Sequence, residues 1–286
     1  MSLGLKEGGM SRYIPSLVLE CLDESESRYF NEVFDRCQGY PSLQQLWRLM
    51  DEQWVACGCD PQQLDDRVSA FYRHPVWLLN GLFIEQDRQS LSYRQAFADW
   101  TASRNPVRIA DFGGGFGTLA RLIASLLPNS QVEVVEPYPH PAAIAMAADT
   151  PNLRFVPELD GMYDLLIATD VFEHVSDPIH VAYKTAKHLQ IGGEYLIANC
   201  FSPVILCHLP QLFYLSICWD MVIQAMGLEP NQRVEYGMAY VRHGELDQVS
   251  ARDVASRARR IYSLLKYLPK GRARVGGMIM KLTSIF

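Results

Sequence analysis

Hydrophobic positions divide this chain into two parts with different spacing. From residue 13 to about residue 103, apolar side chains recur at three- and four-residue intervals, which predicts helices throughout. The clearest stretches are 17–37, 42–57, 61–83 and 90–103. Pro75 interrupts the third of them and is expected to end or kink a helix at His74.

Short apolar runs alternate with helical segments after Pro106. Strands are expected at 107–112, 131–136, 153–156, 163–172 and 193–201, and one or two closing strands at 232–242. Helices are expected at 117–127, 141–149, 177–189 and 209–228. This alternation predicts an α/β fold, in which a doubly wound, mostly parallel sheet carries helices on both faces.

A glycine-rich loop follows the first predicted strand. Asp111 ends that strand, and four of the next six residues are glycines: Gly113, Gly114, Gly115 and Gly117. Glycine reaches positive φ and lets a ligand lie directly on the backbone. The carboxyl end of a parallel strand is also where open α/β sheets bind ligands. The loop therefore predicts a ligand site, with the next helix N-terminus available to an anionic group.

The order of these residues resembles motif I of class I S-adenosylmethionine-dependent methyltransferases, with an acid followed by alternating glycines. In that family the acid, here Asp111, anchors the methionine amino end of the cofactor. The resemblance gives the ribose hydroxyls to Glu136, at the end of the second strand, and the adenine ring to Pro137 and Tyr138. Contact with the adenine edge is expected from Glu158 and Leu159.

Two later segments extend the resemblance. Residues 163–178 look like the fourth strand and following loop of small-molecule methyltransferases, with Thr169 and Asp170 as further candidates for cofactor contact. Residues 189–201 look like the turn and fifth strand, with Ile191 where the family usually has proline. The resemblance implies a Rossmann-like methyltransferase sheet of seven strands.

The resemblance covers about residues 100–245 and implies an S-adenosylmethionine-binding methyltransferase domain at 104–245. The flanking parts match no family: a helical N-terminal lid or accessory region (1–103) is expected from its apolar spacing, and a basic C-terminal tail (246–286) from its charge. The implied reaction moves the sulfonium methyl to an oxygen, nitrogen or carbon atom of a small, partly apolar acceptor. A proton on that atom often has to be removed, which a general base accelerates about 10²–10⁴-fold. The candidates are His174 first, then Glu173 and His208, all in loops that follow strands.

Two other interpretations stay open at this point. Gly115, Gly117 and Ala120 satisfy the G-x-G-x-x-A form of a dinucleotide site. The acid Glu136 also suits a nicotinamide cofactor, so an oxidoreductase is the first alternative. A non-catalytic protein that binds S-adenosylmethionine for regulation is the second.

Composition narrows the class of protein. The chain has 286 residues, 49% of them hydrophobic and 20% charged, which excludes a disordered protein. Its net charge of −6 argues against nucleic acid as a partner, and no apolar run is long enough for a membrane span. The basic tail offers a surface for an anionic membrane or an acidic partner.

The seven cysteines fit no disulfide pattern, so a cytoplasmic location is expected. Cys57 and Cys59 form a C-x-C pair, with Cys37 and His74 in the same half of the chain. One such pair is weak evidence for zinc, so no metal site is predicted. The first few residues resemble a leader or a loose terminus.

Overall fold

The N-terminal part of the chain is helical, as its apolar spacing predicts. The computed structural model describes residues 10–265, so the expected leader and the end of the basic tail lie outside the described residues. The helices before the sheet are α2 (Ser16–Leu19), α3 (Glu24–Cys37), α4 (Leu43–Ala56), α5 (Asp66–Tyr72), α6 (Pro75–Ile84) and α7 (Arg88–Arg104). His74 is the N-cap of α6, so the expected break at that residue is confirmed.

Seven strands form one sheet in the order β3-β2-β1-β4-β5-β7-β6. They are β1 (Arg108–Phe112), β2 (Gln131–Val135), β3 (Leu153–Val156), β4 (Tyr163–Thr169), β5 (Leu189–Ala198), β6 (Leu228–Val234) and β7 (Gly237–Arg242). Strands β1 to β5 pair in parallel, and β7 is antiparallel to both β5 and β6. The predicted seven-stranded, mostly parallel sheet is confirmed.

Helices cover both faces of the sheet, so the doubly wound prediction is also confirmed. They are α8 (Thr118–Leu126), α9 (Pro141–Ala147), α10 (Pro178–Ala186), α11 (Trp219–Ala225) and α12 (Gln248–Leu265). Ile109 and Ile167 belong to a core shared with α7 and α8, whereas Ala110 and Leu166 belong to a core shared with α10 and α11. Neighbouring strand residues point to opposite faces, and each strand therefore contributes to two cores.

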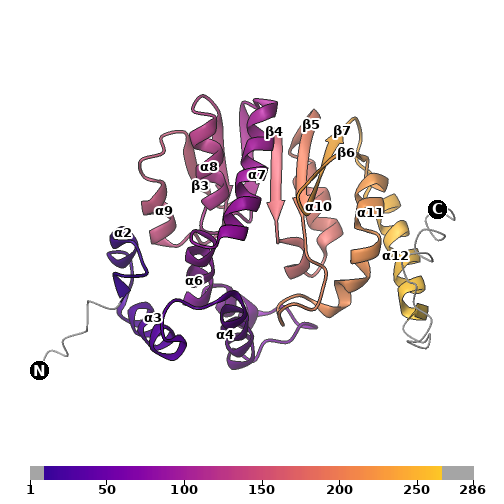
Figure 1. Cartoon of the computed structure of the whole chain (residues 1–286). Coiled ribbons are helices and arrows are strands. Elements are labelled where there is room, and N and C mark those ends of the chain that lie inside the picture. Colours follow the sequence, from indigo (N-terminus) through magenta and orange to yellow (C-terminus); the bar gives the residue numbers. More distant parts are fainter. Residues whose placement is uncertain (1–9, 266–286) are drawn as a thin grey trace, which may run out of the picture.

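The helices α2 to α6 gather beyond one end of the sheet, the end at which the arrow of β4 points (Figure 1). A direct contact joins α6 to the glycine loop, because a Cβ at Gly81 would lie 2.6 Å from Cβ of Phe116. Glu85, the C-cap of α6, accepts hydrogen bonds from Thr118 and Arg121 at the start of α8. The N-terminal helices therefore cover the edge where the site is expected.

The predicted helix at 209–228 is only partly correct. A 3-10 helix, η2 (Pro210–Ile217), precedes α11, because Cys218 adopts φ −140° and interrupts the helical path. Strand β6 begins at Leu228, earlier than expected. Pro230 is tolerated there because β6 is an edge strand and its register shifts between Pro230 and Gln232.

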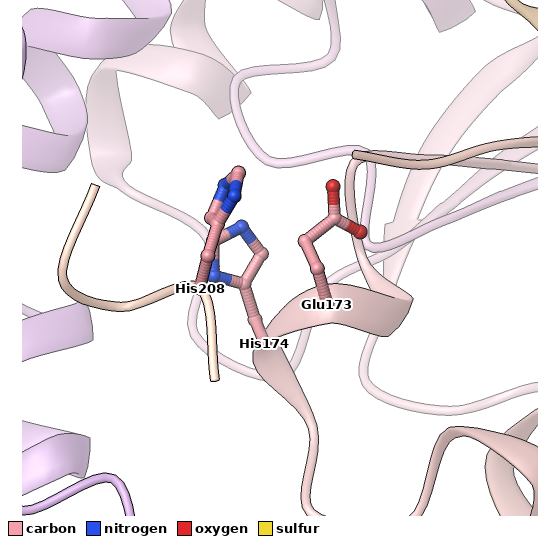
Figure 2. Close-up of side chains that lie close together, drawn as sticks. All are labelled: Glu173, His174 and His208. Carbon is pink, nitrogen blue, oxygen red and sulfur yellow. The ribbon is translucent and has the colours of Figure 1, made fainter. Parts of the chain in front are cut away.

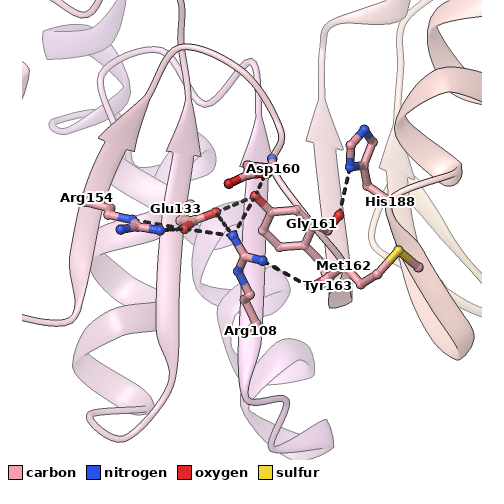
Figure 3. Close-up of polar contacts among 8 residues, drawn as sticks. All are labelled: Arg108, Glu133, Arg154, Asp160, Gly161, Met162, Tyr163 and His188. Carbon is pink, nitrogen blue, oxygen red and sulfur yellow. Dashed lines mark hydrogen bonds and ion pairs between the residues drawn. The ribbon is translucent and has the colours of Figure 1, made fainter.

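A buried glutamate joins four strands of the sheet. Glu133 on β2 is 1% exposed and accepts hydrogen bonds from Arg108 on β1, Arg154 on β3 and Tyr163 on β4 (Figure 3). Burial opposes ionisation of Glu133, but the hydrogen bonds of Tyr163, Arg154 and Arg108 outweigh it and lower its pKa. Both oxygens of Glu133 are hydrogen-bonded, which marks this carboxylate as part of the framework.

The described part of the predicted basic tail is helix α12, which packs against α11 and exposes Arg257, Arg259 and Arg260. No helix among residues 10–265 is long and apolar enough to cross a membrane. A cavity of about 410 Å³ lies at the start of β1 and β5, lined among others by Val107 and Gly192. None of the residues predicted to form the site lines it.

Candidate functional site

The glycine loop after β1 is shaped by close contacts that only glycine allows. Gly113 has φ +70°, and a Cβ there would lie 2.6 Å from Cγ2 of Val171. A Cβ at Gly114 would lie 2.6 Å from Oδ2 of Asp111. Gly115 differs, since it has φ +53° but no atom within 4 Å of a Cβ position, so its surface is open to a ligand.

Asp111 lies behind this loop with one oxygen unsatisfied. Its side chain is 1% exposed, and Oδ1 has no hydrogen-bond partner among the described residues. Burial raises the pKa of Asp111 to about 7, and the charge of Arg94 on α7 opposes that rise. A buried acceptor of this kind suits a cationic or proton-donating group that approaches across the glycine loop.

Glu136 lies next to the loop, one residue beyond the end of β2. Burial raises its pKa, and the backbone N–H groups of Tyr138 and Gly115 oppose the rise. The N–H of Tyr138 lies 3.4 Å from Oε1 of Glu136. The structure therefore brings Glu136 to the open position at Gly115, whereas its contact with a ribose stays a prediction.

Three of the expected adenine contacts point outward. Pro137 is exposed, Tyr138 is 73% exposed, and the guanidinium of Arg73 lies 5.8 Å from the Tyr138 ring centroid. Glu158 is exposed as well, whereas Leu159 is partly buried against the core. Of these four residues, only Leu159 is held in place by contacts with the hydrophobic core.

The end of β4 carries a second acid near the first. Asp170 follows Thr169 and has φ +55°, and its Oδ2 accepts a hydrogen bond from the Tyr236 hydroxyl at 2.9 Å. The guanidinium of Arg94 lies 4.0 Å from the same oxygen. Arg94 thus acts electrostatically on both Asp111 and Asp170, which places it between the two strand ends.

Glu173, His174 and His208 come together at this edge. Glu173 and His174 belong to η1 (Phe172–His174) after β4, and His208 lies in the loop after β5. One ligand atom of each side chain lies within 4.8 Å of one from each of the others, and the carboxylate stands beside the two rings (Figure 2). The three side chains predicted to act on the acceptor therefore form one cluster.

Glu173 is buried and incompletely hydrogen-bonded. It is 1% exposed, Oε1 accepts the backbone N–H of Cys200 at 2.7 Å, and Oε2 has no partner among the described residues. Burial, reinforced by the charge of Asp170, raises the pKa of Glu173 to about 8. The carboxylate is thus poised near neutral pH, where a general acid or base is most effective.

Both histidines direct one ring nitrogen at a backbone carbonyl. Nδ1 of His174 lies 3.2 Å from the Cys207 oxygen, and Nδ1 of His208 lies 2.8 Å from the Ser202 oxygen. Burial, together with the charge of His208, lowers the pKa of His174 to about 3, and burial also lowers that of His208. His174 is therefore a weaker base than its position in the sequence suggested.

Aromatic side chains from the N-terminal helices close over the cluster. The rings of Tyr72 and Trp77 lie edge-on to His174, with centroids 6.1 and 6.0 Å away. The backbone N–H of Leu206, near His208, donates to Asp51 on α4 at 2.7 Å. Residues of the predicted lid thus border the site.

Sequence reasoning missed several residues of this edge. Tyr236, Cys200, Tyr72 and Trp77 were not singled out, because each reaches the site from a different element and has no motif around it. The aromatic residues between Phe71 and Trp77 were visible only as part of an apolar stretch. The C-x-C interpretation gained no support, since His74 accepts a helix-capping hydrogen bond.

Comparison with known proteins identifies the family of the chain. The model of the methyltransferase domain family matches residues 81–260. No curated protein matches the chain. Mitomycin 7-O-methyltransferase is similar in structure, with 14% identity over 80% of this chain and 76% of that one and a TM-score of 0.49.

Human N-acetylserotonin methyltransferase, solved in complex with SAM, shares 17% identity over 82% of this chain and 74% of that one, with a TM-score of 0.45. A third structure is Burkholderia thailandensis 1,6-didemethyltoxoflavin-N1-methyltransferase with bound S-adenosylhomocysteine. It shares 16% identity over 68% of this chain and 91% of that one, with a TM-score of 0.44. At these identities the likeness concerns overall fold only.

Proposed function

This chain belongs to the methyltransferase domain family, and on that premise we propose that it transfers a methyl group from S-adenosylmethionine to a small, partly apolar acceptor. The cofactor supplies a methyl group on a positively charged sulfur, which leaves as a neutral thioether. The protein has to hold the acceptor atom in line with that methyl group and exclude water. Positioning of this kind contributes up to about 7–11 kcal/mol.

The residues around the glycine loop fit such a cofactor. Asp111 offers an unpaired, buried oxygen to an ammonium group, and the open backbone at Gly115 lets a ligand approach. Glu136 offers a carboxylate beside Gly115, and a carboxylate can accept hydrogen bonds from two neighbouring hydroxyls. Arg94 carries the positive charge that a cofactor carboxylate would meet.

The cluster of Glu173, His174 and His208 supports the acceptor side of the proposal. It lies at the same sheet edge as the loop, since Val171, two residues before Glu173, contacts Gly113. Oε2 of Glu173 is free to accept a hydrogen bond from a substrate. A substrate with a proton on oxygen or nitrogen would be bound there, and partial removal of that proton would make the atom more nucleophilic. The rings of Tyr72 and Trp77 favour a flat or apolar acceptor.

The single observation that carries the proposal is the pair of unsatisfied buried carboxylates, Asp111 and Glu173, at one end of the sheet. Buried polar groups without partners are rare and call for an explanation. A nicotinamide enzyme would account for the loop but not for the family to which the chain belongs. A non-catalytic protein that binds S-adenosylmethionine would account for Asp111 but leaves Glu173 without a role.

Calorimetry tests the cofactor directly. We expect binding of S-adenosylhomocysteine and none of NAD. Glu136→Ala should weaken the binding about 10–100-fold, because it removes hydrogen bonds to a charged group. Glu20→Ala, at an exposed position on the N-terminal part, serves as the matched control and should leave the affinity unchanged. Tight NAD binding, or an unchanged affinity of Glu136→Ala, would contradict the proposal.

A further inference from the structure

Two loops far apart in sequence bring together two imidazoles and a carboxylate. Glu173 and His174 follow β4, His208 follows β5, and their ligand atoms all lie within 4.8 Å of one another. It is the one such group found among residues 10–265. We propose that these three side chains bind a divalent transition-metal cation of the zinc type, although no metal was expected from the sequence.

The hydrogen bonds of the histidines fix the tautomer that a metal needs. A backbone carbonyl has no proton to give, so Nδ1 of His174 and of His208 must each carry the hydrogen that points at Cys207 and Ser202. In the neutral ring Nε2 then holds a free lone pair. Histidines that bind metals usually have this arrangement, with the second ring nitrogen donating to a carbonyl or carboxylate.

His188 has the same arrangement, with Nδ1 2.8 Å from the Gly161 oxygen, but it belongs to no such group of ligand atoms among residues 10–265. Two other histidines differ. Nδ1 of His74 accepts from the backbone N–H of Val76, and Nδ1 of His140 accepts from that of Ala142. Both rings cap a helix in this way. Nε2 of His140 contacts Glu26 at 2.8 Å, so both of its nitrogens are already used. His140 beside Glu26 therefore resembles the cluster in composition but cannot accept a cation.

Glu173 supplies an independent observation. Its side chain is 1% exposed, and its Oε2 atom has no hydrogen-bond partner among the described residues. An unpaired carboxylate oxygen in such a place is costly unless it takes up a proton or a cation meets it. Asp170 adds negative charge close by, which raises the pKa of Glu173 and would favour a cation further.

The ligand set defines the class of ion. Two imidazoles and one carboxylate suit zinc and its first-row neighbours, and three protein ligands leave a position open for another molecule. Magnesium and calcium prefer sets made of oxygen atoms. Ligand atoms around tetrahedral zinc lie about 3.3 Å apart, as bond lengths of about 2.0–2.2 Å require, so modest side-chain rotations would close the cluster around the ion. His174 is only partly buried, whereas Glu173 and His208 are buried.

Binding of the ion does not depend on the proposed function, but the role of the ion in methyl transfer rests on that function. The open position would take an acceptor oxygen, and coordination to a divalent cation lowers the pKa of such an oxygen. The cluster would then act on the acceptor through the ion. The proposal concerns these three side chains and leaves Asp111, Glu136 and the glycine loop unchanged in their roles.

The test titrates the full chain, stripped with a chelator, with Zn²⁺ by calorimetry and with Co²⁺ by visible absorption. We expect one ion per chain, with a cobalt spectrum of nitrogen and oxygen ligands. Glu173→Gln and His208→Ala should each weaken binding more than about 100-fold, since loss of a supporting residue alone costs about 10–100-fold. His140→Ala is the matched control and should bind as the wild type does.

Several results would overturn the proposal. One is folded wild-type protein that binds neither ion, or binds Mg²⁺ in preference to both. Another is binding that persists in Glu173→Gln and His208→Ala, or a cobalt spectrum with sulfur-to-metal charge transfer, which would assign the ion to cysteines. Binding of S-adenosylhomocysteine is measured in the same samples. If it is normal while no ion binds, the metal site is wrong and the proposed function stands. If the ion binds but S-adenosylhomocysteine does not, the metal site stands and the proposed function is wrong.

Discussion

Two glutamates of this sheet are equally buried but differ in what surrounds them. Glu133 in the middle of β2 and Glu173 beyond the end of β4 are each 1% exposed. Arg108, Arg154 and Tyr163 donate to Glu133, and its pKa is lowered. Glu173 receives one backbone N–H and keeps one oxygen unpaired, and its pKa is raised to about 8.

The difference shows how burial alone misleads. Removing a buried carboxylate whose partners are complete destabilises the folded chain, because it leaves those partners uncompensated. A buried carboxylate without them costs stability and is retained where a ligand or a reaction needs it. By that criterion we assign Glu173 and Asp111 to the proposed site and Glu133 to the framework.

The largest effect is expected from Glu173→Gln. The amide keeps the shape of the side chain but cannot take a proton or hold a cation as a carboxylate does. Methyl transfer should fall about 10²–10⁴-fold, the range that general-base assistance covers. The acceptor is first identified by screening small aromatic hydroxyl and amine compounds for production of S-adenosylhomocysteine. Wild-type activity in Glu173→Gln would end the distinction between the two glutamates.

Glu133→Gln is the reciprocal variant. It should destabilise the chain by about 1–3 kcal/mol, the cost of leaving buried groups without partners, while the affinity for S-adenosylhomocysteine stays the same. The loss of stability should lie at the lower end of this range, because the Arg154 side chain is 66% exposed and can hydrogen-bond to water once Glu133 is replaced. Urea unfolding at pH 7 measures it.

The stability difference between wild type and Glu133→Gln should depend on pH. Because folding lowers the pKa of Glu133, its carboxylate contributes stability above its ordinary pKa, and this contribution disappears as the pH falls through the lowered value. The difference between wild type and Glu133→Gln should therefore shrink at low pH. A difference that grows in acid would show that the network is not held by the ionised carboxylate.

A methyl group placed against Asp111 should destabilise the chain no more than Glu133→Gln does. Unlike Glu133→Gln, it should also weaken the binding of S-adenosylhomocysteine. Gly114→Ala would put Cβ 2.6 Å from Oδ2 of Asp111, and overpacking of this kind costs about 1–3 kcal/mol. Gly244→Ala is the control, because a Cβ there meets no atom within 4 Å. If both variants bind S-adenosylhomocysteine equally well, the close fit of the loop has no role in the site.

The smallest effect is a pH dependence. Asp111 has its pKa raised to about 7, so it is mostly protonated at pH 6 and ionised at pH 8. An ammonium group binds the ionised form, so affinity for S-adenosylhomocysteine should rise over this range, by at most about tenfold per pH unit. Asp111→Asn should bind more weakly and lose this slope, and a slope that survives would have to come from another group.

The sequence by itself determined the class of fold and the loop at which we propose the cofactor site. Helical spacing before residue 104 and short apolar runs after it follow from local geometry, and the break at Pro75 follows from its missing N–H. Asp111 and the glycines are neighbours in the chain, so their shared loop was visible without a structure.

Only the tertiary structure decided which polar groups are left without partners. His208 reaches His174 because β5 pairs beside β4, and Tyr72 reaches His174 because the N-terminal helices fold back over the strand ends. Burial of Glu173 and the bond from Tyr236 to Asp170 likewise depend on contacts between distant segments. Hydrophobic spacing encodes which face of an element is buried, but a hydrogen bond left unmade depends on every element that surrounds it.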